Sequence, residues 1–416
     1  MAIEQPSGAT PTTPTTGGEG EGREARAAGA ATAAGPGAEA GRRERGDLAQ
    51  APLRYAGLFE EPSGYGQAAR AHLGALVGAG VRVRPHLMIS SSERVRGGSG
   101  AEFCRGLPKP FADGNERLAI LHTIPTSFQD LTKNERVRVG LTAWDAPVLP
   151  STWVEPSARV DEIWVPSEFS AGAFREATKT PVEVIPHPVV PFEGGAAPYP
   201  GLPDGRFFFL SVFEWQERKN PIGLLRAFRA AFQGKRDVAL VLKLGYHFGA
   251  SRDDIARELR REARGGVGPW RAPDVYVIWD DLSPPMLARL FRRADAYVSL
   301  HRAEGFGLCM AQAMATGKPV VATAYSANLE YMDDASAFLV PGELVRARSE
   351  PWHPFEREMR WCEADRGAAV EALRACAYDD AERERRASAG RARVLALCGP
   401  GPIGRRMAER VARLGA

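Results

Sequence analysis

Short apolar runs alternate with longer mixed segments from residue 53 onward. The runs predict strands and the segments between them predict helices. In the first half we expect strands at 53–59, 81–87, 118–124, 137–143, 162–166 and 182–186, and helices at about 67–77 and 168–177. Because the strands are apolar on both faces, they should form a parallel sheet that helices cover on both sides.

The second half repeats this pattern. Strands are expected at 207–213, 238–244, 275–279, 296–300 and 319–322, and helices at 221–232, about 253–264, 284–293 and after residue 307. A stretch rich in Pro and Gly at 192–205 marks a linker. The predicted fold class is therefore α/β, with two doubly wound Rossmann-like domains and a cleft between the carboxyl ends of their strands.

The same patterns divide the chain. We expect a disordered tail at 1–49, an N-terminal domain at 50–195, a C-terminal domain at 205–398 and a closing helix at 400–416. The tail is mostly Ala, Gly, Thr, Pro, Glu and Arg, and buries too little apolar surface to offset the entropy of ordering. Helical patterns at 381–398 and 402–414 are separated by Gly399-Pro400-Gly401, which breaks a helix.

Overall charge and cysteine content narrow the class of protein. The 416 residues carry a net charge of only +3, so nothing favours nucleic acid over a small molecule as partner. Five scattered cysteines without CxxC pairs disfavour a disulfide framework or a zinc site, and a reducing cytoplasm fits best.

No segment approaches the roughly 20 apolar residues of a membrane span. Arginines between 383 and 413 leave peripheral contact with anionic lipid open, beside the alternative of a solvated helix face.

The segment 296–320 carries the main candidate site. An apolar run stops at a polar cluster, glycines at 305 and 307 free the backbone, and an Ala/Met-rich helical pattern follows. Such a loop presents free N–H groups and the positive end of a helix dipole to an anion, and a phosphate-bearing ligand is expected. Glu304 is placed either to bind sugar hydroxyls or only to cap the turn. Gln312 lies just over two helical turns further on, so both side chains can enter one pocket.

Two cations form a second candidate site. Arg218 and Lys219 end the loop after the 207–213 strand and precede a helix opened by Pro221, a favoured first position. Cations at such a place can hold a diphosphate and stabilise negative charge that develops on a leaving group. Solvation of a surface turn is the alternative.

Glycines and histidines give weaker indications. Gly64 and Gly66 follow the first strand, where they permit close approach of a ligand or simply make a turn. His122 ends an apolar strand and so belongs either to the cleft or to the core, as do His187 and His301. No HxxxH or HExxH spacing supports a metal. The chain also has no GxSxG or Walker motif, and no GxGxxG between an expected strand and a helix, so nothing supports a serine hydrolase, an NTPase or a nicotinamide dehydrogenase.

With these elements assembled, the chain resembles the retaining glycosyltransferases of GT-B fold in family 4, the glycosyl transferases group 1, over about residues 53–414. The resemblance rests on Arg218-Lys219-Asn220 and on the Glu-Gly-Phe-Gly-Leu element at 304–308. Weaker support comes from 64–66, 141–145, 161–167, 184–188 and 317–323. Trp144 and the 161–167 stretch are similar to those of polysaccharide mannosyltransferases, which favours GDP-mannose as donor.

The resemblance implies an activity. A family member moves a hexose from a GDP- or UDP-sugar to a hydroxyl of a glycan, lipid-linked or small-molecule acceptor, without a cofactor or metal. It retains the anomeric configuration, through front-face attack assisted by the departing phosphate. Glu304 and His122 would contact the donor sugar, and Lys219 with Arg218 would hold the diphosphate. The remaining donor-binding positions would be Gly305, Phe306, Gly307, Leu308 and, at the ribose, Gln312.

Two departures from the family pattern keep an alternative open. Gln312 replaces the second acidic residue, which should weaken nucleotide binding by about 1–2 kcal/mol. Phe213 stands where many relatives place an arginine, so Arg218 must compensate. The alternative is a catalytically weak GT-B protein that binds nucleotide sugar as a partner subunit. A sugar-nucleotide epimerase or a phosphorylase is a third reading.

Overall fold

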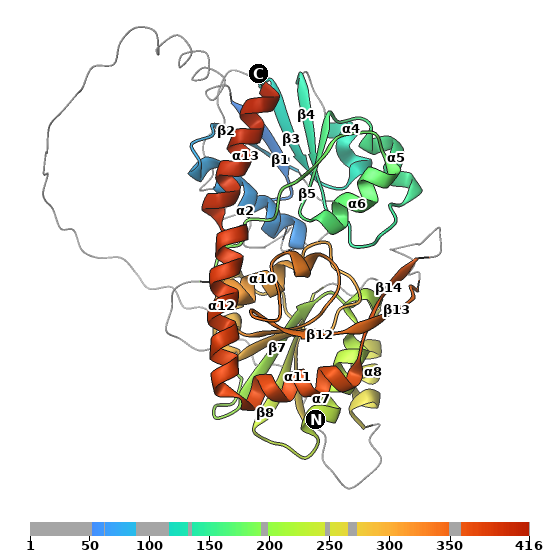
Figure 1. The fold of residues 1–416 in the computed structure, drawn as a ribbon, viewed down its shortest axis with the longest axis vertical. Helices are drawn as coiled ribbons and strands as arrows, with labels where there is room; N and C mark the ends of the chain where they lie inside the picture. Colours follow the sequence, from blue (N-terminus) through green and yellow to red (C-terminus); the bar gives the residue numbers. More distant parts are fainter. Residues whose placement is uncertain are drawn as a thin grey trace, which may run out of the picture.

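The computed structural model describes residues 52–61, 63–88, 116–131, 135–192, 199–245, 250–264, 273–348 and 359–415. The predicted tail at 1–49, residues 89–115 and part of the predicted 192–205 linker lie outside these ranges. Two α/β units stand one above the other, and the end of the chain returns to the first (Figure 1).

The first sheet has six parallel strands in the order β2-β1-β3-β4-β5-β6. Its strands are β1 (Leu53–Gly57), β2 (Val83–Leu87), β3 (Leu118–His122), β4 (Val137–Leu141), β5 (Glu162–Val165) and β6 (Val182–Val184). Its helices are α2 (Gly64–Gly78), α4 (Phe128–Leu131), α5 (Ser151–Ser157) and α6 (Glu168–Ala177). Alternate residues of one strand enter different cores: Tyr55 belongs to the same core as Leu73 of α2, and Ala56 to the same core as Phe174 of α6. Both faces of the sheet are therefore covered, as the apolar runs predict.

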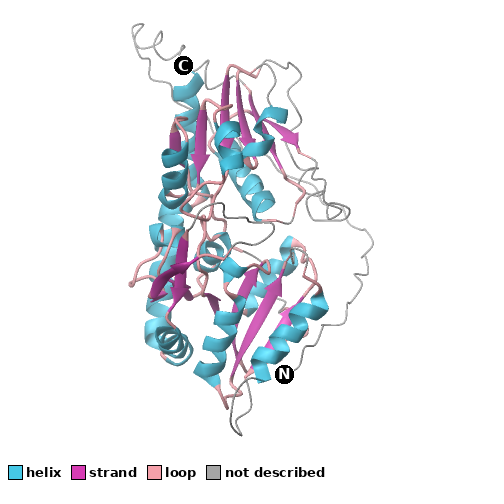
Figure 2. Ribbon diagram, turned by 90° about the vertical axis from the view of Figure 1, so that its right-hand side faces the viewer, coloured by secondary structure: helices cyan, strands magenta, loops and turns pink. Residues whose placement is uncertain are grey.

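The second sheet also has six strands, in the order β12-β11-β10-β7-β8-β9, and all its pairings are parallel. Its strands are β7 (Phe207–Phe213), β8 (Val238–Leu244), β9 (Asp274–Ile278), β10 (Ala296–Ser299), β11 (Val320–Thr323) and β12 (Phe338–Val340). Its helices are α7 (Pro221–Phe232), α8 (Arg252–Arg264), α9 (Pro284–Arg293), α10 (Leu308–Ala315), α11 (Arg366–Tyr378) and α12 (Asp380–Cys398). The view at right angles shows helices on both sides of each sheet (Figure 2). The predicted fold class, two Rossmann-like domains in a GT-B arrangement, is confirmed.

Several elements were not predicted. They include β12, α11 and an antiparallel hairpin of β13 (Gly342–Arg346) and β14 (Arg360–Ala364). Four of the five residues of β13 are exposed, so its sequence lacks the apolar run by which the other strands were recognised. The first helix also begins earlier than expected, at Gly64, because the Ser63 hydroxyl accepts a hydrogen bond from the Gly66 N–H and caps it.

The last helix, α13 (Pro400–Gly415), packs against α2 of the first domain (Figure 1). Ile403 and Met407 enter the same core as Tyr55 and Leu73. A Cβ added at Gly404 would lie 2.4 Å from the Ala75 carbonyl oxygen, so the helices approach more closely than a larger residue permits. The chain thus crosses between the domains twice, and α13 completes the N-terminal core.

Many C-terminal arginines are engaged in ion pairs within the chain. The pairs are Arg383–Asp380, Arg385–Glu382, Arg386–Glu382, Arg393–Asp333, Arg406–Glu183 and Arg410–Glu162. This pairing supports the reading of a solvated helix face rather than a lipid-binding one. Among the described residues, none of the helices combines the length and the apolar character that crossing a bilayer requires.

Candidate active site

A cleft of about 730 Å³ lies between the carboxyl ends of the two sheets. Residues from both domains line it. The N-terminal domain contributes Gly64, Tyr65, His122, Trp144, Asp145 and His187, and the C-terminal domain contributes Phe213, Arg218, Lys219, Lys243, Glu304–Met310 and Gln312. Ligands of doubly wound domains bind at this end of the strands.

The glycine loop between β10 and α10 lies directly against the N-terminal domain. A Cβ at Gly305 would come within 2.8 Å of the Trp144 carbonyl oxygen, and Gly307 has a φ of 81°. Both positions therefore need glycine, one for close approach and the other for a left-handed backbone. Ser167 donates a hydrogen bond of 2.7 Å to the Gly305 carbonyl, and the Tyr331 hydroxyl donates one of 2.7 Å to the Phe306 carbonyl. The loop is thus fixed from both domains.

Glu304 forms the centre of a charged network. Its carboxylate lies 2.5 Å from Lys219 Nζ and 3.5 Å from Arg218 Nη1. Arg218 Nε also lies 2.8 Å from Asp145 Oδ2, an ion pair that crosses the cleft. Burial raises the pKa of Glu304, but the neighbouring Lys219 and Arg218 outweigh it, so the pKa is lowered. Glu304 is therefore ionised at neutral pH and faces both cations.

A capped turn places the two cations. Asn220 has a φ of 53°, and its side chain accepts a hydrogen bond of 3.1 Å from the Gly223 N–H at the start of α7. Asparagine tolerates this left-handed backbone better than most residues. The Arg302 N–H donates to the Arg218 carbonyl at 2.7 Å, which ties the cation loop to the glycine loop. The two candidate loops of the sequence therefore lie together in one site.

Gln312 of α10 lines the same cleft as Glu304. Its Oε1 atom is buried, and no described residue hydrogen-bonds to it. A buried amide oxygen without a partner costs stability, so a ligand hydroxyl or water that donates to it would be favourable.

His122 ends β3 at the cleft, where its Nδ1 lies 2.7 Å from the Tyr55 hydroxyl. His187 also lines the cleft and packs edge-on against Phe306, with 5.0 Å between ring centroids. His301 is instead buried at hydrogen-bond distance from Ser299 and Asn328 and does not line the cleft. The three histidines that sequence left ambiguous therefore separate into two cleft residues and one core residue.

Most of the predicted site residues meet in this cleft, and Gly66 is the exception. A Cβ at Gly66 would lie 2.1 Å from the Glu61 carbonyl oxygen, so this glycine allows tight packing behind the site. Sequence reasoning missed Asp145 and Lys243 as site residues. Each follows or ends a strand that was recognised. The place of Lys243 beside Phe213 depends on the pairing of β7 with β8, and that of Asp145 beside Arg218 depends on how the two domains pack.

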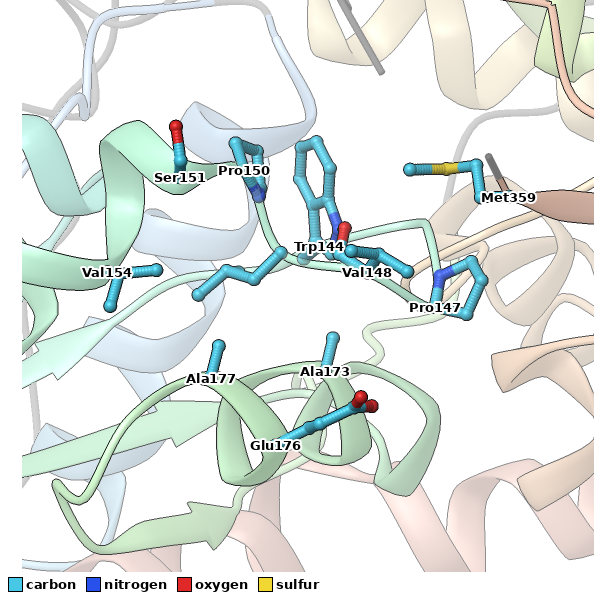
Figure 3. A pocket seen from close by; sticks show the side chains of 11 residues that line it. Trp144, Pro147, Val148, Pro150, Ser151, Val154, Ala173, Glu176, Ala177 and Met359 are labelled. Carbon is cyan, nitrogen blue, oxygen red and sulfur yellow. The ribbon is translucent and has the colours of Figure 1, made fainter. Parts of the chain in front are cut away.

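A second cavity, of about 350 Å³, adjoins the cleft on the N-terminal side (Figure 3). Trp144 borders both spaces and donates from its indole N–H to the Val148 carbonyl at 2.8 Å. The remaining walls are mostly apolar and come from the 147–150 loop, α5, α6 and Met359, with Ser151 and Glu176 as the polar members. The cleft is therefore adjoined beyond Trp144 by a cavity that exposes both apolar and polar atoms.

Comparison with known proteins agrees with this architecture. Residues 204–350 match the family model of the glycosyl transferases group 1. A stretch of 123 residues is 31% identical to D-inositol 3-phosphate glycosyltransferase of Pseudarthrobacter chlorophenolicus; it covers 30% of this chain and 28% of that relative.

Two solved structures resemble most of the chain. Anabaena HepE in complex with UDP and glucose has a TM-score of 0.60 at 15% identity, over 88% of this chain and 100% of that one. Sucrose-phosphate synthase from Thermosynechococcus elongatus has a TM-score of 0.61 at 17% identity, over 88% and 99%. At such identities the likeness is one of fold. The protein is therefore a GT-B protein. Its C-terminal domain carries the group 1 glycosyl transferase match, and the loops with Arg218, Lys219 and Glu304 lie within it.

Proposed function

We propose that the protein is a retaining glycosyltransferase that transfers a hexose from a nucleoside diphosphate sugar to a hydroxyl acceptor. The proposal rests on one observation: Arg218 and Lys219 meet Glu304 at the start of α10, in a cleft shared by two domains. Cations beside a helix N-terminus suit a diphosphate, and a carboxylate suits sugar hydroxyls. HepE, whose structure holds UDP and glucose, has the same fold and so supports this kind of donor.

The residues divide the chemistry between them. When the glycosidic bond breaks, negative charge develops on the departing diphosphate, and Arg218 and Lys219 are placed to stabilise it without a metal. Glu304 then accepts hydrogen bonds from the sugar and keeps its charge near the electron-poor ring. Front-face attack by the acceptor, assisted by the departing phosphate, retains the anomeric configuration. We keep a GDP-sugar beside a UDP-sugar as donor, since Trp144 and the 161–167 stretch favour the first and HepE the second.

The acceptor could be a glycan, a lipid-linked molecule or a small molecule. Among these, an acceptor that joins a hydroxyl to an apolar group has the most support. The cavity beside Trp144 offers apolar side chains to such a group and polar atoms to its hydroxyl, next to the cleft. Alkyl glycosides therefore belong in an acceptor screen beside free sugars.

The decisive experiment is a binding and turnover screen of the purified protein over UDP- and GDP-hexoses, with and without acceptors. We expect one donor to bind and to be consumed, with an α-linked donor giving an α-linked product by NMR. Glu304→Ala should reduce turnover about 100-fold or more. Glu371→Ala, an exposed position on α11, is the control. Full activity in Glu304→Ala would remove the site assignment.

The second candidate, a donor-binding subunit with little activity, is favoured by the unpartnered Gln312 oxygen and by Phe213. Donor binding without turnover in the same screen would select it. Donor consumption without any acceptor would instead point to an epimerase or a phosphorylase.

A further inference from the structure

Three histidines pack together behind and along the wall of the cleft. Ring centroids are 5.4 Å apart for His72 and His122, 5.2 Å for His72 and His187, and 6.2 Å for His122 and His187. His122 and His187 line the cleft, whereas His72 lies behind them on α2. Burial lowers the pKa of all three, to about 3 for His187, so each ring is neutral at physiological pH. A neutral imidazole has one N–H donor and one acceptor nitrogen, and its contacts decide which is which.

Tyr55 determines the proton position on His122. The Tyr55 side chain is fully buried, and its hydroxyl lies 2.7 Å from His122 Nδ1. No other described residue accepts from this hydroxyl. A buried O–H left without an acceptor is costly, so Tyr55 donates and His122 Nδ1 accepts. The proton of His122 is then on Nε2, which has no hydrogen-bond partner among the described residues.

Met407 determines the proton positions on the other two rings. His72 Nδ1 lies 3.3 Å from Met407 Sδ, and His72 Nε2 lies 3.0 Å from His187 Nδ1. A thioether can only accept, so His72 donates from Nδ1 to the sulfur. His72 Nε2 must then accept from the Nδ1–H of His187. This assignment satisfies both contacts of His72, and it leaves Nε2 of His187 as a bare acceptor.

We infer that His122 and His187 form a subsite for a sugar hydroxyl, in which His122 Nε2–H donates and His187 Nε2 accepts. Tyr55, His72 and Met407 are the positioning residues that fix these opposite roles. A hydroxyl is both a donor and an acceptor, so it suits one neighbour of each kind. The inference rests on the proposed function, since it takes the ligand of the cleft to be a sugar.

The proton positions can be read directly. Two-bond ¹H–¹⁵N correlation spectra of the full chain at neutral pH should show His122 protonated at Nε2, and His72 and His187 at Nδ1. Met407→Leu removes the acceptor at similar volume, so His72 and His187 should both shift toward protonation at Nε2. Ile403→Leu, one helical turn away in the same core, should leave the spectrum unchanged. His187 protonated at Nε2 in the parent protein would overturn the subsite.

Kinetics give a second, separate test. Met407→Leu and Tyr55→Phe should each lower kcat/KM by roughly three- to tenfold, the effect of one hydrogen bond, whereas Ile403→Leu should not. In a His122→Ala background Tyr55→Phe should have no further effect, because Tyr55 acts through that ring. Equal losses in both backgrounds would show a purely structural role. A chain without transfer activity would refute the proposed function but would leave the spectra readable, so the two failures are distinguishable.

Discussion

Gln312 is the residue on which the strength of donor binding depends. Its buried Oε1 has no protein partner among the described residues, and its side chain lines the same cleft as Glu304. An amide can accept from one ribose hydroxyl and donate to another, whereas a carboxylate accepts from both with charge assistance. Gln312 therefore suits the ribose of a nucleoside, but it binds the ribose less tightly than the acidic residue that the family has at this position.

Gln312→Glu should tighten binding of a nucleoside diphosphate sugar by about five- to thirtyfold, equivalent to about 1–2 kcal/mol. Isothermal titration with the best donor of the screen measures this directly, and turnover is followed in parallel. A large gain in turnover would mean that the natural chain has lost activity at this position. Tighter binding with unchanged turnover would mean that the amide already serves catalysis.

Lys243 supplies a cation next to Phe213, which stands where many relatives have an arginine. Strand pairing places Lys243 opposite Val212, next to Phe213, and both Phe213 and Lys243 line the cleft. Burial raises the pKa of the Cys309 thiol to about 11, and Lys219 and Lys243 both oppose this rise, so both lysines lie near the first turn of α10. Lys243 is also 3.9 Å from Asp281 Oδ1.

We therefore expect Lys243→Met to weaken UDP or GDP binding by roughly tenfold, because a charge-assisted contact to the diphosphate is lost. The loss should be smaller for the free nucleoside, which carries no phosphate. Lys179→Met, at an exposed position of the N-terminal domain, is the matched control. If nucleoside and nucleotide are affected equally, Lys243 does not contact the diphosphate.

At the scale of the elements, the glycine loop depends on one left-handed residue. Gly307 has a φ of 81°, and a Cβ there would lie 2.3 Å from Met310 Cε and 2.9 Å from the Tyr331 hydroxyl. Tyr331 cannot move freely, since it hydrogen-bonds to the carbonyls of Phe306 and Gly307. The backbone and the packing therefore both exclude a side chain.

Gly307→Ala should destabilise the protein by about 1–3 kcal/mol and reduce turnover, because the strain moves the loop that carries Glu304. Gly172→Ala in α6, where an added Cβ meets nothing within 4 Å, should be neutral or slightly stabilising. Thermal unfolding and the donor assay on the same samples test both effects. A Tm of Gly307→Ala equal to that of the parent would contradict the strain argument.

Sequence alone predicted most of the elements in which an apolar run was bounded by Pro, Gly or polar residues, although the short strand β12 was missed. The expected 168–177, 207–213, 221–232, 238–244 and 284–293 coincide with α6, β7, α7, β8 and α9. It missed α11, whose apolar residues are mostly alanines and give a weak pattern. Glu304, Lys219 and Gln312 were found because each adjoins such an element. Lys243 was not, since only the pairing of β7 with β8 brings it to the site. Asp145 was not, since its contact with Arg218 depends on the packing of the two domains.

The whole molecule has its histidine cluster at the place where the two domains and α13 meet. His72 contacts Met407 of α13, and His187 contacts Phe306 of the glycine loop. These residues are distant in sequence, so periodicity could not predict the cluster. Three neutral buried rings at such a junction make the stability of the fold depend on pH.

The sign of that dependence follows from the pKa values. Burial lowers the pKa of His72, His122 and His187 below the ordinary value of 6.5, to about 3 for His187. Below pH 6.5 the unfolded chain binds protons that the folded chain does not, so stability falls as the pH falls. Each histidine contributes a slope of about 1.4 kcal/mol per pH unit until its folded pKa is reached.

We therefore expect the free energy of unfolding, measured in urea at pH 7.5, 6.0, 5.5, 5.0 and 4.5, to decrease steeply below pH 6.5. In His187→Gln the slope between about pH 4.5 and 5.5 should be smaller by roughly 1.4 kcal/mol per pH unit, whatever the stability of the variant at pH 7.5. Circular dichroism and tryptophan fluorescence should give coincident transitions in this range. Parallel slopes for the two proteins would show that His187 is protonated in the folded state, and would contradict the neutral ring on which its acceptor role depends.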